Sequence, residues 1–384
     1  MRLMRRGKTA ILVLEDGKTF RGVPFGKLGS TLGEIVFATG MSGYQETLTD
    51  PSYAGQIVVQ TAPHIGNTGM NEEDEESDRI WVSGYVVRNL SRIVSNFRSQ
   101  RTLEEDIVQD EVVGIGELDT RALTLHLRSA GVMRAGIFSD DKADLSVQEL
   151  VEIVKSSEPM AGRSLSSIVS TKSAYTVKPE GDQFGRIAIL DLGIKKSTIL
   201  NMAARGLEVT VFPANSSAED LLSISPDAVF YSNGPGDPST ADHQVSVLKS
   251  ILAKKIPFFG ICFGNQLLGR ALGFETYKLA FGHRGINQPV LDIRTGRVEV
   301  TAHNHGFAVD IQSRNEVASP AGFGRVKVSH VCLNDDVVEG IVCLDLPAYS
   351  VQYHPEAAAG PHDANYLFDR LIELISRTRS EKGN

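Results

Sequence analysis

One of the three cysteines, Cys262, lies between two glycines in the segment Gly260-Ile261-Cys262-Phe263-Gly264. The segment joins a predicted strand over 257–261 to a predicted helix over 265–272. Such a strand-to-helix turn is tight, and glycines two positions either side of the middle residue remove steric collisions. The positive end of the helix favours a thiolate, and the Phe263 N–H would face a developing oxyanion. The pattern predicts a nucleophilic cysteine, whereas a cysteine without these flanks would indicate a small buried hydrophobic residue.

A cysteine nucleophile needs a base that accepts its proton and later protonates the departing amine. Of the nine histidines, His354 stands out because Pro355 and Glu356 follow it. Proline keeps the preceding residue extended, and residues two apart in an extended segment point to the same side. Glu356 can therefore hold the His354 imidazole in its useful tautomer. We predict a triad of Cys262, His354 and Glu356; without Cys262, the His-Pro pair would indicate an ordinary surface turn.

Two other segments invite a metal or a phosphate interpretation. His303 and His305 lie two residues apart, but no third metal ligand stands near them in the sequence, so we predict no metal site. Residues 193–198, Gly-Ile-Lys-Lys-Ser-Thr, follow a predicted strand but lack the Gly-x-x-x-x-Gly-Lys spacing of a phosphate loop. We therefore expect no cofactor in this chain.

The elements that must position the triad alternate between strand and helix. Strands alternating with helices imply right-handed βαβ units and a parallel sheet with helices on both faces. We predict an α/β protein whose C-terminal part is a flavodoxin-like, doubly wound, mostly parallel sheet with a nucleophile elbow. Ser216 and Glu219 fit a capping box. The predicted strands are 187–192, 207–212, 228–231 and 258–261, and the predicted helices are 196–205, 216–224, 240–254 and 265–272.

The N-terminal part predicts a mixed β/α domain. Residues 10–14 and 18–22 flank an Asp-Gly turn and predict a hairpin, and 34–38 and 56–60 are further strand candidates. Asp119 is a candidate N-cap for a helix that continues to Arg128. A stretch rich in Ser, Lys, Gly and Pro follows this part. The predicted organisation is an N-terminal domain over 1–157, a linker over 158–184 and a second domain over 185–384.

The overall composition argues against several classes of protein. The 384 residues carry a formal net charge of −8, whereas a broad nucleic-acid-binding face would be basic. No apolar run is long enough to cross a membrane, and the run at 11–14 after the basic start is too short for a signal peptide. Three cysteines without a Cys-x-x-Cys pair favour neither a disulfide framework nor structural zinc, and we expect Cys332 and Cys343 in the core. We expect a cytoplasmic protein that binds neither nucleic acid nor membrane.

The elbow and the His-Pro-Glu segment together resemble the class I, or triad, glutamine amidotransferases. That family also carries a glycine-rich oxyanion segment after a strand, and Ser232-Asn233-Gly234-Pro235-Gly236-Asp237-Pro238 matches it here. The resemblance implies that Gly234 and Gly236 lend backbone groups to glutamine and the oxyanion. It also implies that Phe263 and Gln266 bind glutamine. By itself the segment would indicate a surface turn.

Over essentially its whole length, the chain resembles the small subunit of glutamine-dependent carbamoyl phosphate synthetase. The resemblance implies that Ser52 reaches the glutamine site from the first domain and that Asn304, Gly306 and Phe307 line it. The motifs that carry it are Thr-Gly-Met-Ser-Gly-Tyr-Gln-Glu-Thr-Leu-Thr-Asp-Pro-Ser-Tyr (39–53), Pro-His-Ile-Gly-Asn (63–67), Asp-Thr-Arg (119–121), Phe-Gly-His-Arg-Gly (281–285) and Asn-His-Gly-Phe-Ala-Val-Asp (304–310).

The resemblance also implies a reaction and a partner. L-Glutamine would be the substrate, and the partner in a heterodimer would be the large subunit of carbamoyl phosphate synthetase. ATP, Mg²⁺ and bicarbonate would bind on that large subunit, which would make carbamoyl phosphate for arginine and pyrimidine biosynthesis. This chain would itself hold no cofactor and no metal.

Two positions depart from the pattern of the family. Phe263 stands where leucine is usual, and Asn265 stands where histidine is usual. Phe263 offers the same backbone N–H and Asn265 is outside the triad, so both bear on glutamine affinity rather than on the chemistry. Two alternatives stay open: a stand-alone cysteine hydrolase of γ-glutamyl bonds that needs no partner, and a non-catalytic scaffold whose site has decayed.

Overall fold

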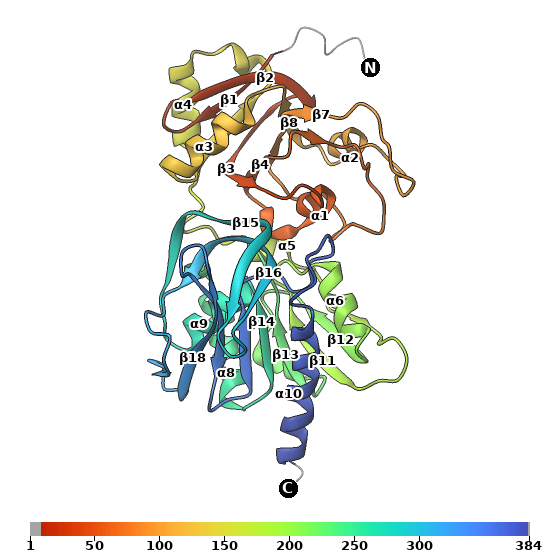
Figure 1. Ribbon diagram of the computed structural model, residues 1–384, viewed down its shortest axis with the longest axis vertical. Coiled ribbons are helices and arrows are strands. Elements are labelled where there is room, and N and C mark those ends of the chain that lie inside the picture. The colour runs from red at the N-terminus through yellow and green to blue at the C-terminus, as the bar shows by residue number, and fades with distance from the viewer. Residues whose placement is uncertain (1–8, 383–384) are drawn as a thin grey trace. The chain divides into compact units, whose positions relative to one another are not determined.

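The computed structural model describes residues 9–382, which fall into two compact units divided between Arg163 and Ser164 (Figure 1). The basic start of the chain, residues 1–8, lies outside the described residues. The segment predicted as a linker, 158–184, contains α5 (Ser166–Val169) and the short strand β10 (Tyr175–Val177). β10 pairs with β12 of the second unit, because its aromatic and β-branched residues suit a sheet edge. The sequence did not predict β10, because its three residues are too few to show the alternation that marks a strand.

The first unit is built on a closed barrel with the strand order β1-β2-β8-β6-β4-β3-β9. The predicted hairpin is confirmed: β1 pairs with β2, and the turn between them places Gly17 at a φ of 91°. The predicted N-cap is also confirmed, since the Asp119 side chain accepts a hydrogen bond from the Ala122 N–H at the start of α3. The strands of this unit are β1 (Ala10–Leu14), β2 (Thr19–Gly26), β3 (Ser30–Ala38), β4 (Gln56–Gln60), β5 (His64–Ile65), β6 (Gly84–Val86), β7 (Asn89–Leu90), β8 (Val113–Gly116) and β9 (Met133–Phe138).

The helices of the first unit lie in the connections between these strands. Apolar side chains of the barrel strands and of α3, among them Ile35, Ile57 and Leu123, form one buried cluster. Closing the sheet into a barrel leaves no unpaired strand edge. The helices are α1 (Tyr44–Thr49), η1 (Pro51–Tyr53), α2 (Leu103–Gln109), α3 (Thr120–Ala130), η2 (Asp141–Asp144) and α4 (Val147–Lys155).

The second unit is a mixed sheet with the strand order β10-β12-β11-β13-β14-β20-β19-β18-β15-β16, and β17 pairs with β18. The strands from β12 to β20 in this order are parallel, which confirms that part of the prediction. The strands from β19 to β16 are antiparallel, so the prediction of a mostly parallel sheet was too broad. The long strands β15 and β16 carry many polar residues without a simple alternation, and this hid them in the sequence.

Besides β10, the strands of this sheet are β11 (Gly185–Leu190), β12 (Leu207–Phe212), β13 (Ala228–Tyr231), β14 (Phe258–Ile261), β15 (Thr276–Asp292), β16 (Arg297–Val309), β17 (Val317–Ala318), β18 (Arg325–Cys332), β19 (Val338–Cys343) and β20 (Ala348–Val351). The helices are α6 (Lys196–Ala203), α7 (Ala218–Leu222), η3 (Pro238–Thr240), α8 (Asp242–Ala253), α9 (Phe263–Ala271) and α10 (Tyr366–Lys382). Cys332 and Cys343 are buried on β18 and β19, as predicted.

Helices cover both faces of the parallel part of this sheet. Consecutive residues of β11 alternate between two buried clusters, with Ala188 in one and Ile189 in the other. The first cluster includes residues of α7, α8 and α9, and the second includes residues of α6 and α10. This two-sided burial explains why the parallel strands are continuous apolar runs.

The predicted capping box of the second helix was wrong by one residue. Ser217, not Ser216, caps α7, and its partner is Asp220 rather than Glu219. The Ser216 N–H instead donates to the carbonyl of Pro213, which keeps Ser216 in the preceding turn. None of the helices within residues 9–382 combines the length and the apolar character that a membrane crossing requires.

Candidate functional site

Cys262 occupies the turn between β14 and α9 with a φ of 55° and a ψ of −100°. This conformation is rare for a residue with a side chain. The main chain holds it there, since the Cys262 N–H donates to the carbonyl of Val351. A side chain at Gly260 would place its Cβ 2.8 Å from the carbonyl carbon and oxygen of Gly264. The glycines that flank Cys262 are therefore required by the backbone, as the sequence suggested.

Gly264→Ala is expected to destabilise the second unit. Its Cβ would lie 2.3 Å from the carbonyl oxygen of Tyr231, which is backbone and cannot move aside easily. Overpacking of this kind costs about 1–3 kcal/mol, which lowers the melting temperature of a unit this size by about 5 °C. Calorimetry of the variant checks this. Gly29→Ala is the control, because its Cβ would meet only Val113 Cγ2, at 3.9 Å; equal melting temperatures for the two variants would contradict the prediction.

The structure brings His354 and Glu356 together beside Cys262. His354 Nδ1 lies 2.7 Å from Glu356 Oε1, and both side chains are buried. The His354 N–H donates to the carbonyl of Ala302, and Cys262 Sγ donates to the carbonyl of Asn304 at 3.6 Å. One strand, β16, therefore contacts the main chain of the predicted base and the thiol of the predicted nucleophile.

Lys195 is a fourth charged member of this group that sequence reasoning missed. Its Nζ lies 2.7 Å from Glu356 Oε1, and its side chain is only 7% exposed. The residue precedes α6, just after β11, in the segment 193–198 that lacks the spacing of a phosphate loop. A lysine at the carboxyl end of a buried parallel strand was the available signal, because that edge of a sheet is where sites form.

Lys195, His354 and Glu356 shift one another's pKa values. Burial disfavours ionised Glu356, but Lys195 and His354 outweigh it and lower the pKa of Glu356 to about 2. Burial and Lys195 lower the pKa of His354, whereas Glu356 and an interaction with the Cys262 side chain raise it, with a net rise to about 10. Near neutral pH, Glu356 is a carboxylate and His354 an imidazolium. Such a histidine can donate a proton to a departing amine.

For the glutamine hydrolysis that the resemblance implies, Lys195→Met is expected to lower kcat/KM about 10- to 100-fold, because Glu356 would no longer be fixed beside His354. It is also expected to cost about 3 kcal/mol of stability, because a buried carboxylate loses its cation. Glutamate release and urea unfolding measure the two effects. The control is the exposed neighbour, as Lys196→Met. Lys195→Met combined with Glu356→Gln should regain stability but not activity; no regain would contradict a role through Glu356.

Asn304 is the predicted glutamine-binding residue with the clearest capacity to bind. Its side chain is buried, and neither Nδ2 nor Oδ1 has a hydrogen-bond partner within residues 9–382. A buried amide without partners costs free energy, so such a group is normally satisfied by water or a ligand. Phe307, on the same strand, is also buried, and Lys278 Nζ lies 5.1 Å from the centre of its ring. Gly306 lies between them in sequence.

Gln266 and Asn265 are buried on α9 and are held by neighbouring side chains. Gln266 Nε2 donates to the carbonyl of Phe307 at 3.0 Å and to Gln352 Oε1 at 3.2 Å. Asn265 bonds to Gln352 and to Ser350, at 3.1 and 2.8 Å. Asn265, where the family usually has histidine, thus serves the packing of α9 against β20 and not the triad.

The glycine-rich segment after β13 approaches other backbone closely. A Cβ at Gly234 would lie 2.1 Å from the carbonyl oxygen of Leu192, and Gly236 has a φ of 98°. Both positions therefore demand glycine. The Asn233 side chain donates to the carbonyl of Gly193 at 2.9 Å, which ties the segment to the loop that carries Lys195.

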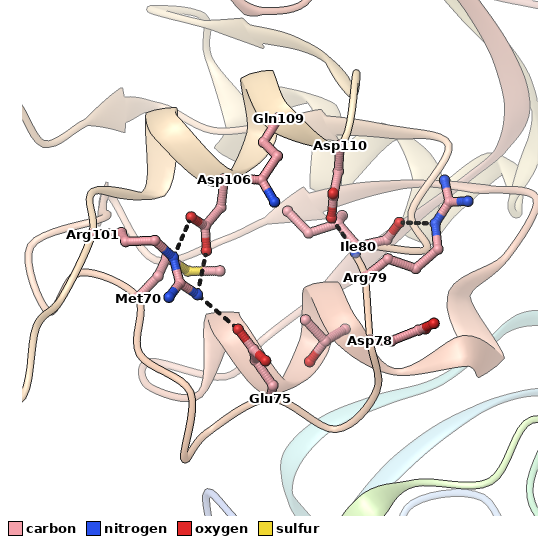
Figure 2. Close-up of a pocket in the computed structure, with 10 residues that line it drawn as sticks. Met70, Glu75, Asp78, Arg79, Ile80, Arg101, Asp106, Gln109 and Asp110 are labelled. Carbon is pink, nitrogen blue, oxygen red and sulfur yellow. Dashed lines mark hydrogen bonds and ion pairs between the residues drawn. The ribbon is translucent and has the colours of Figure 1, made fainter.

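Ser52, the remaining predicted site residue, lies in η1 of the first unit and is buried; its part in glutamine binding stays a prediction. The first unit also contains a pocket, shown in Figure 2. Arg101 lies in it and pairs with Asp106 and Glu75, at 2.7 Å each. These side chains are paired with one another, and none of the predicted site residues lines the pocket.

His303 and His305, for which the sequence shows no third metal ligand nearby, meet two further candidate ligands in the structure. His283, on β15, and Glu339, on β19, bring ligand atoms within 4.8 Å of theirs. The sequence could not reveal this, because the meeting of the four residues depends on the register between β15 and β16 and on the place of β19 in the sheet.

The chain is similar to known proteins in both of its units. Residues 12–137 match the family model described as carbamoyl-phosphate synthase small chain, CPSase domain, and residues 188–374 match that of glutamine amidotransferase class-I. Similar curated proteins are each named carbamoyl phosphate synthase small chain. The protein of Streptomyces avermitilis is 60% identical over 97% of this chain and 97% of its own length. That of Bifidobacterium longum is 57% identical over 97% of this chain and 95% of its own length. That of Mycobacterium tuberculosis is 56% identical over 96% of this chain and 98% of its own length.

Proposed function

The chain belongs to the family of carbamoyl phosphate synthase small chains, and we propose that it hydrolyses L-glutamine and passes the ammonia to a large subunit. The observation that supports this most is similarity through both units, at 60% identity over 97% of the chain. An amidotransferase match alone would leave the acceptor of the ammonia open. The match over residues 12–137 points to carbamoyl phosphate synthesis.

The proposed reaction begins with attack by the Cys262 thiolate on the side-chain amide carbon of glutamine. A carbon–sulfur bond forms, and the amide oxygen takes the negative charge. The first N–H groups of a helix have no intrahelical acceptor, so the Phe263 N–H at the start of α9 can stabilise this oxyanion together with the segment at Gly234. We assign the elbow, within a flavodoxin-like parallel sheet, to this step.

His354 then protonates the amide nitrogen, the carbon–nitrogen bond breaks, and ammonia leaves a γ-glutamyl thioester on Cys262. Neutral His354 next accepts a proton from water, which attacks the thioester carbon. The carbon–sulfur bond breaks, and glutamate and the Cys262 thiolate are released. Glu356 keeps the imidazole oriented through both steps, and Lys195 keeps Glu356 in place.

The substrate glutamine is proposed to bind along β16 and the glycine-rich segment. The unpartnered amide of Asn304 supports this, since it can both donate to and accept from an amino acid. The further residues assigned to binding are Ser52, Gly234, Gly236, Phe263, Gln266, Gly306 and Phe307.

The proposed partner is the large subunit, which would bind ATP, Mg²⁺ and bicarbonate and make carbamoyl phosphate for arginine and pyrimidine biosynthesis in the cytoplasm. Most free ammonia becomes ammonium at neutral pH, which is not nucleophilic. An enclosed route between the subunits is therefore expected. No cofactor on this chain takes part in the proposed glutamine hydrolysis.

Glutamate release from glutamine tests the proposal, measured with this chain alone and with its large subunit, ATP and bicarbonate. Slow release alone and a strong rise with the partner are expected, with carbamoyl phosphate formed in step. Fast glutamate release at the same rate with and without the large subunit would instead indicate a stand-alone hydrolase. No release under either condition would indicate a scaffold.

A further inference from the structure

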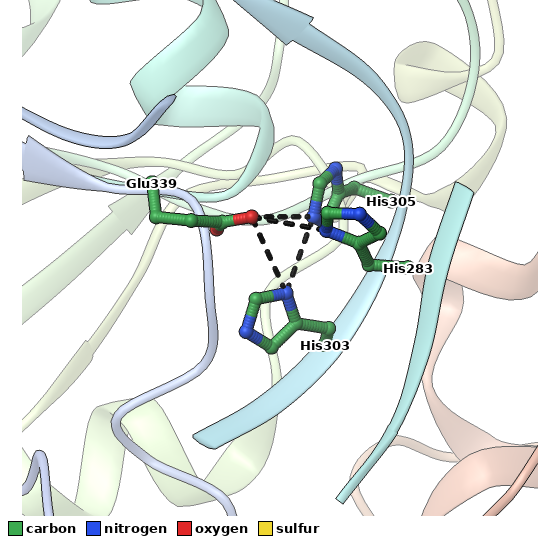
Figure 3. A group of neighbouring side chains, drawn as sticks. All are labelled: His283, His303, His305 and Glu339. Carbon is green, nitrogen blue, oxygen red and sulfur yellow. Dashed lines mark hydrogen bonds and ion pairs between the residues drawn. The ribbon is translucent and has the colours of Figure 1, made fainter. Parts of the chain in front are cut away.

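Four buried side chains converge in the second unit, as Figure 3 shows. His283 comes from β15, His303 and His305 come from β16, and Glu339 comes from β19. Each is at most 5% exposed. Three imidazoles around one carboxylate form a set of nitrogen and oxygen donors that transition metals favour.

Four of the six distances between the donor atoms are close to those of a tetrahedral metal site, and all six are within 4.8 Å. Glu339 Oε1 lies 3.0 Å from His283 Nδ1, 3.5 Å from His305 Nε2 and 3.7 Å from His303 Nδ1. His303 Nδ1 and His305 Nε2 are 3.3 Å apart. Zinc binds nitrogen and oxygen at about 2.0–2.1 Å, so the donors of a tetrahedral zinc site lie about 3.3 Å from one another.

Each histidine also has a partner on the ring nitrogen that faces away from the cluster. Metal-binding histidines almost always carry such a contact, which orients the ring and selects its tautomer. The three contacts are His283 Nε2 to Asp335 Oδ2 at 2.8 Å, His303 Nε2 to Thr301 Oγ1 at 2.7 Å, and His305 Nδ1 to the carbonyl of Phe307 at 2.9 Å.

The hydrogen positions call for extra positive charge at the centre, as protons or as a metal ion. The Phe307 carbonyl can only accept, so His305 Nδ1 carries its proton, and neutral His305 then turns a bare lone pair on Nε2 toward Glu339. Glu339 Oε1 is itself an acceptor, and its Oε2 has no hydrogen-bond partner in the described part of the chain. Two hydrogen-bond acceptors that face each other in a buried site repel one another unless an extra proton or a metal ion lies between them.

We propose that His283, His303, His305 and Glu339 bind one zinc ion. Calcium and magnesium prefer sites made of oxygen atoms, so the three imidazoles disfavour them. Four protein donors fill the tetrahedron, which is typical of a structural rather than a catalytic zinc site.

The ion would tie β15, β16 and β19 together next to the predicted glutamine site. Asn304 lies between His303 and His305, and its carbonyl accepts the hydrogen bond from Cys262 Sγ. Fixing both neighbours of Asn304 fixes the strand that faces the thiol. This consequence rests on the proposed glutaminase, whereas the binding of zinc does not.

Cobalt titration of the full chain, freed of metal with a chelator, tests the proposal. We expect one equivalent of Co²⁺ to bind with the intense visible bands of a tetrahedral site, and Zn²⁺ to displace it. A sulfur-to-cobalt charge-transfer band should be absent, which separates this site from Cys262 and from the group of His283, Cys332 and Asp335. Zinc should also raise the melting temperature by about 5 °C or more.

Glu339→Gln and His303→Gln should each weaken Co²⁺ binding by at least about 100-fold. His330→Gln, which changes a buried histidine outside the cluster, and Cys262→Ser should both retain it. Cys262→Ser also separates the two proposals, since it should lose glutaminase activity and keep the metal. Absence of uptake by the unaltered chain, which depends on no variant, would overturn the proposal in favour of a proton-held cluster. A sulfur-to-cobalt band, or binding unchanged in Glu339→Gln, would overturn it too.

Discussion

Cys262→Ser is expected to reduce glutamate release from glutamine by at least about 10³-fold, with the fold and the association with the large subunit intact. Serine keeps the size of the side chain, and the backbone at this turn is held by Gly260, Gly264 and the bond to Val351. The loss would therefore come from the chemistry alone, because the hydroxyl is a far weaker nucleophile than a thiolate.

The measurement is glutamate release with the large subunit, ATP and bicarbonate present. Labelling by an electrophilic glutamine analogue, detected by mass, should occur on the unaltered chain and vanish in Cys262→Ser. Cys343→Ala is the matched control, because Cys343 is buried in β19 and should leave labelling and release unchanged. Release within about tenfold of the unaltered chain in Cys262→Ser would reject Cys262 as the nucleophile. Carbamoyl phosphate synthesis from added ammonia should survive the substitution.

His354→Asn is expected to lower kcat by about 10³-fold and to change KM by much less. The imidazole exchanges protons with the departing amine and with the attacking water, so both halves of the reaction lose it. It lies 2.7 Å from Glu356, and Lys195 balances the charge of that carboxylate after the substitution. The buried Glu356 therefore keeps a cation, and the variant should remain folded.

Steady-state glutaminase kinetics give kcat and KM, and circular dichroism checks folding. His362→Asn, at an exposed histidine, is the control and should match the unaltered chain. A rise in KM with an unchanged kcat would show that His354 binds glutamine and does not transfer protons. The substitution should also slow labelling of Cys262, because the Cys262 thiolate loses the imidazolium beside it.

The two variants together address the decayed-scaffold alternative. If the chain were an inactive scaffold, neither variant would change glutamate release, because there would be no activity to remove. The structure, however, contains a buried ion pair between Lys195 and Glu356 and a strained turn at Cys262. Both features cost free energy and give no packing advantage over apolar side chains and a relaxed turn. Their presence favours a working site.

The sequence by itself determined the elbow, the His-Pro-Glu segment and the parallel strands. These features are local: glycine spacing, the effect of proline on its neighbour, and runs of apolar residues all act within a few positions.

The tertiary structure alone decided which distant residues meet. Lys195 reaches Glu356, and His283 reaches Glu339, only because strands far apart in the chain belong to one sheet. It also decided the role of Asn265, since its bonds to Ser350 and Gln352 depend on how α9 packs against β20. No short-range pattern encodes such contacts, because they depend on the order of strands and not on spacing along the chain.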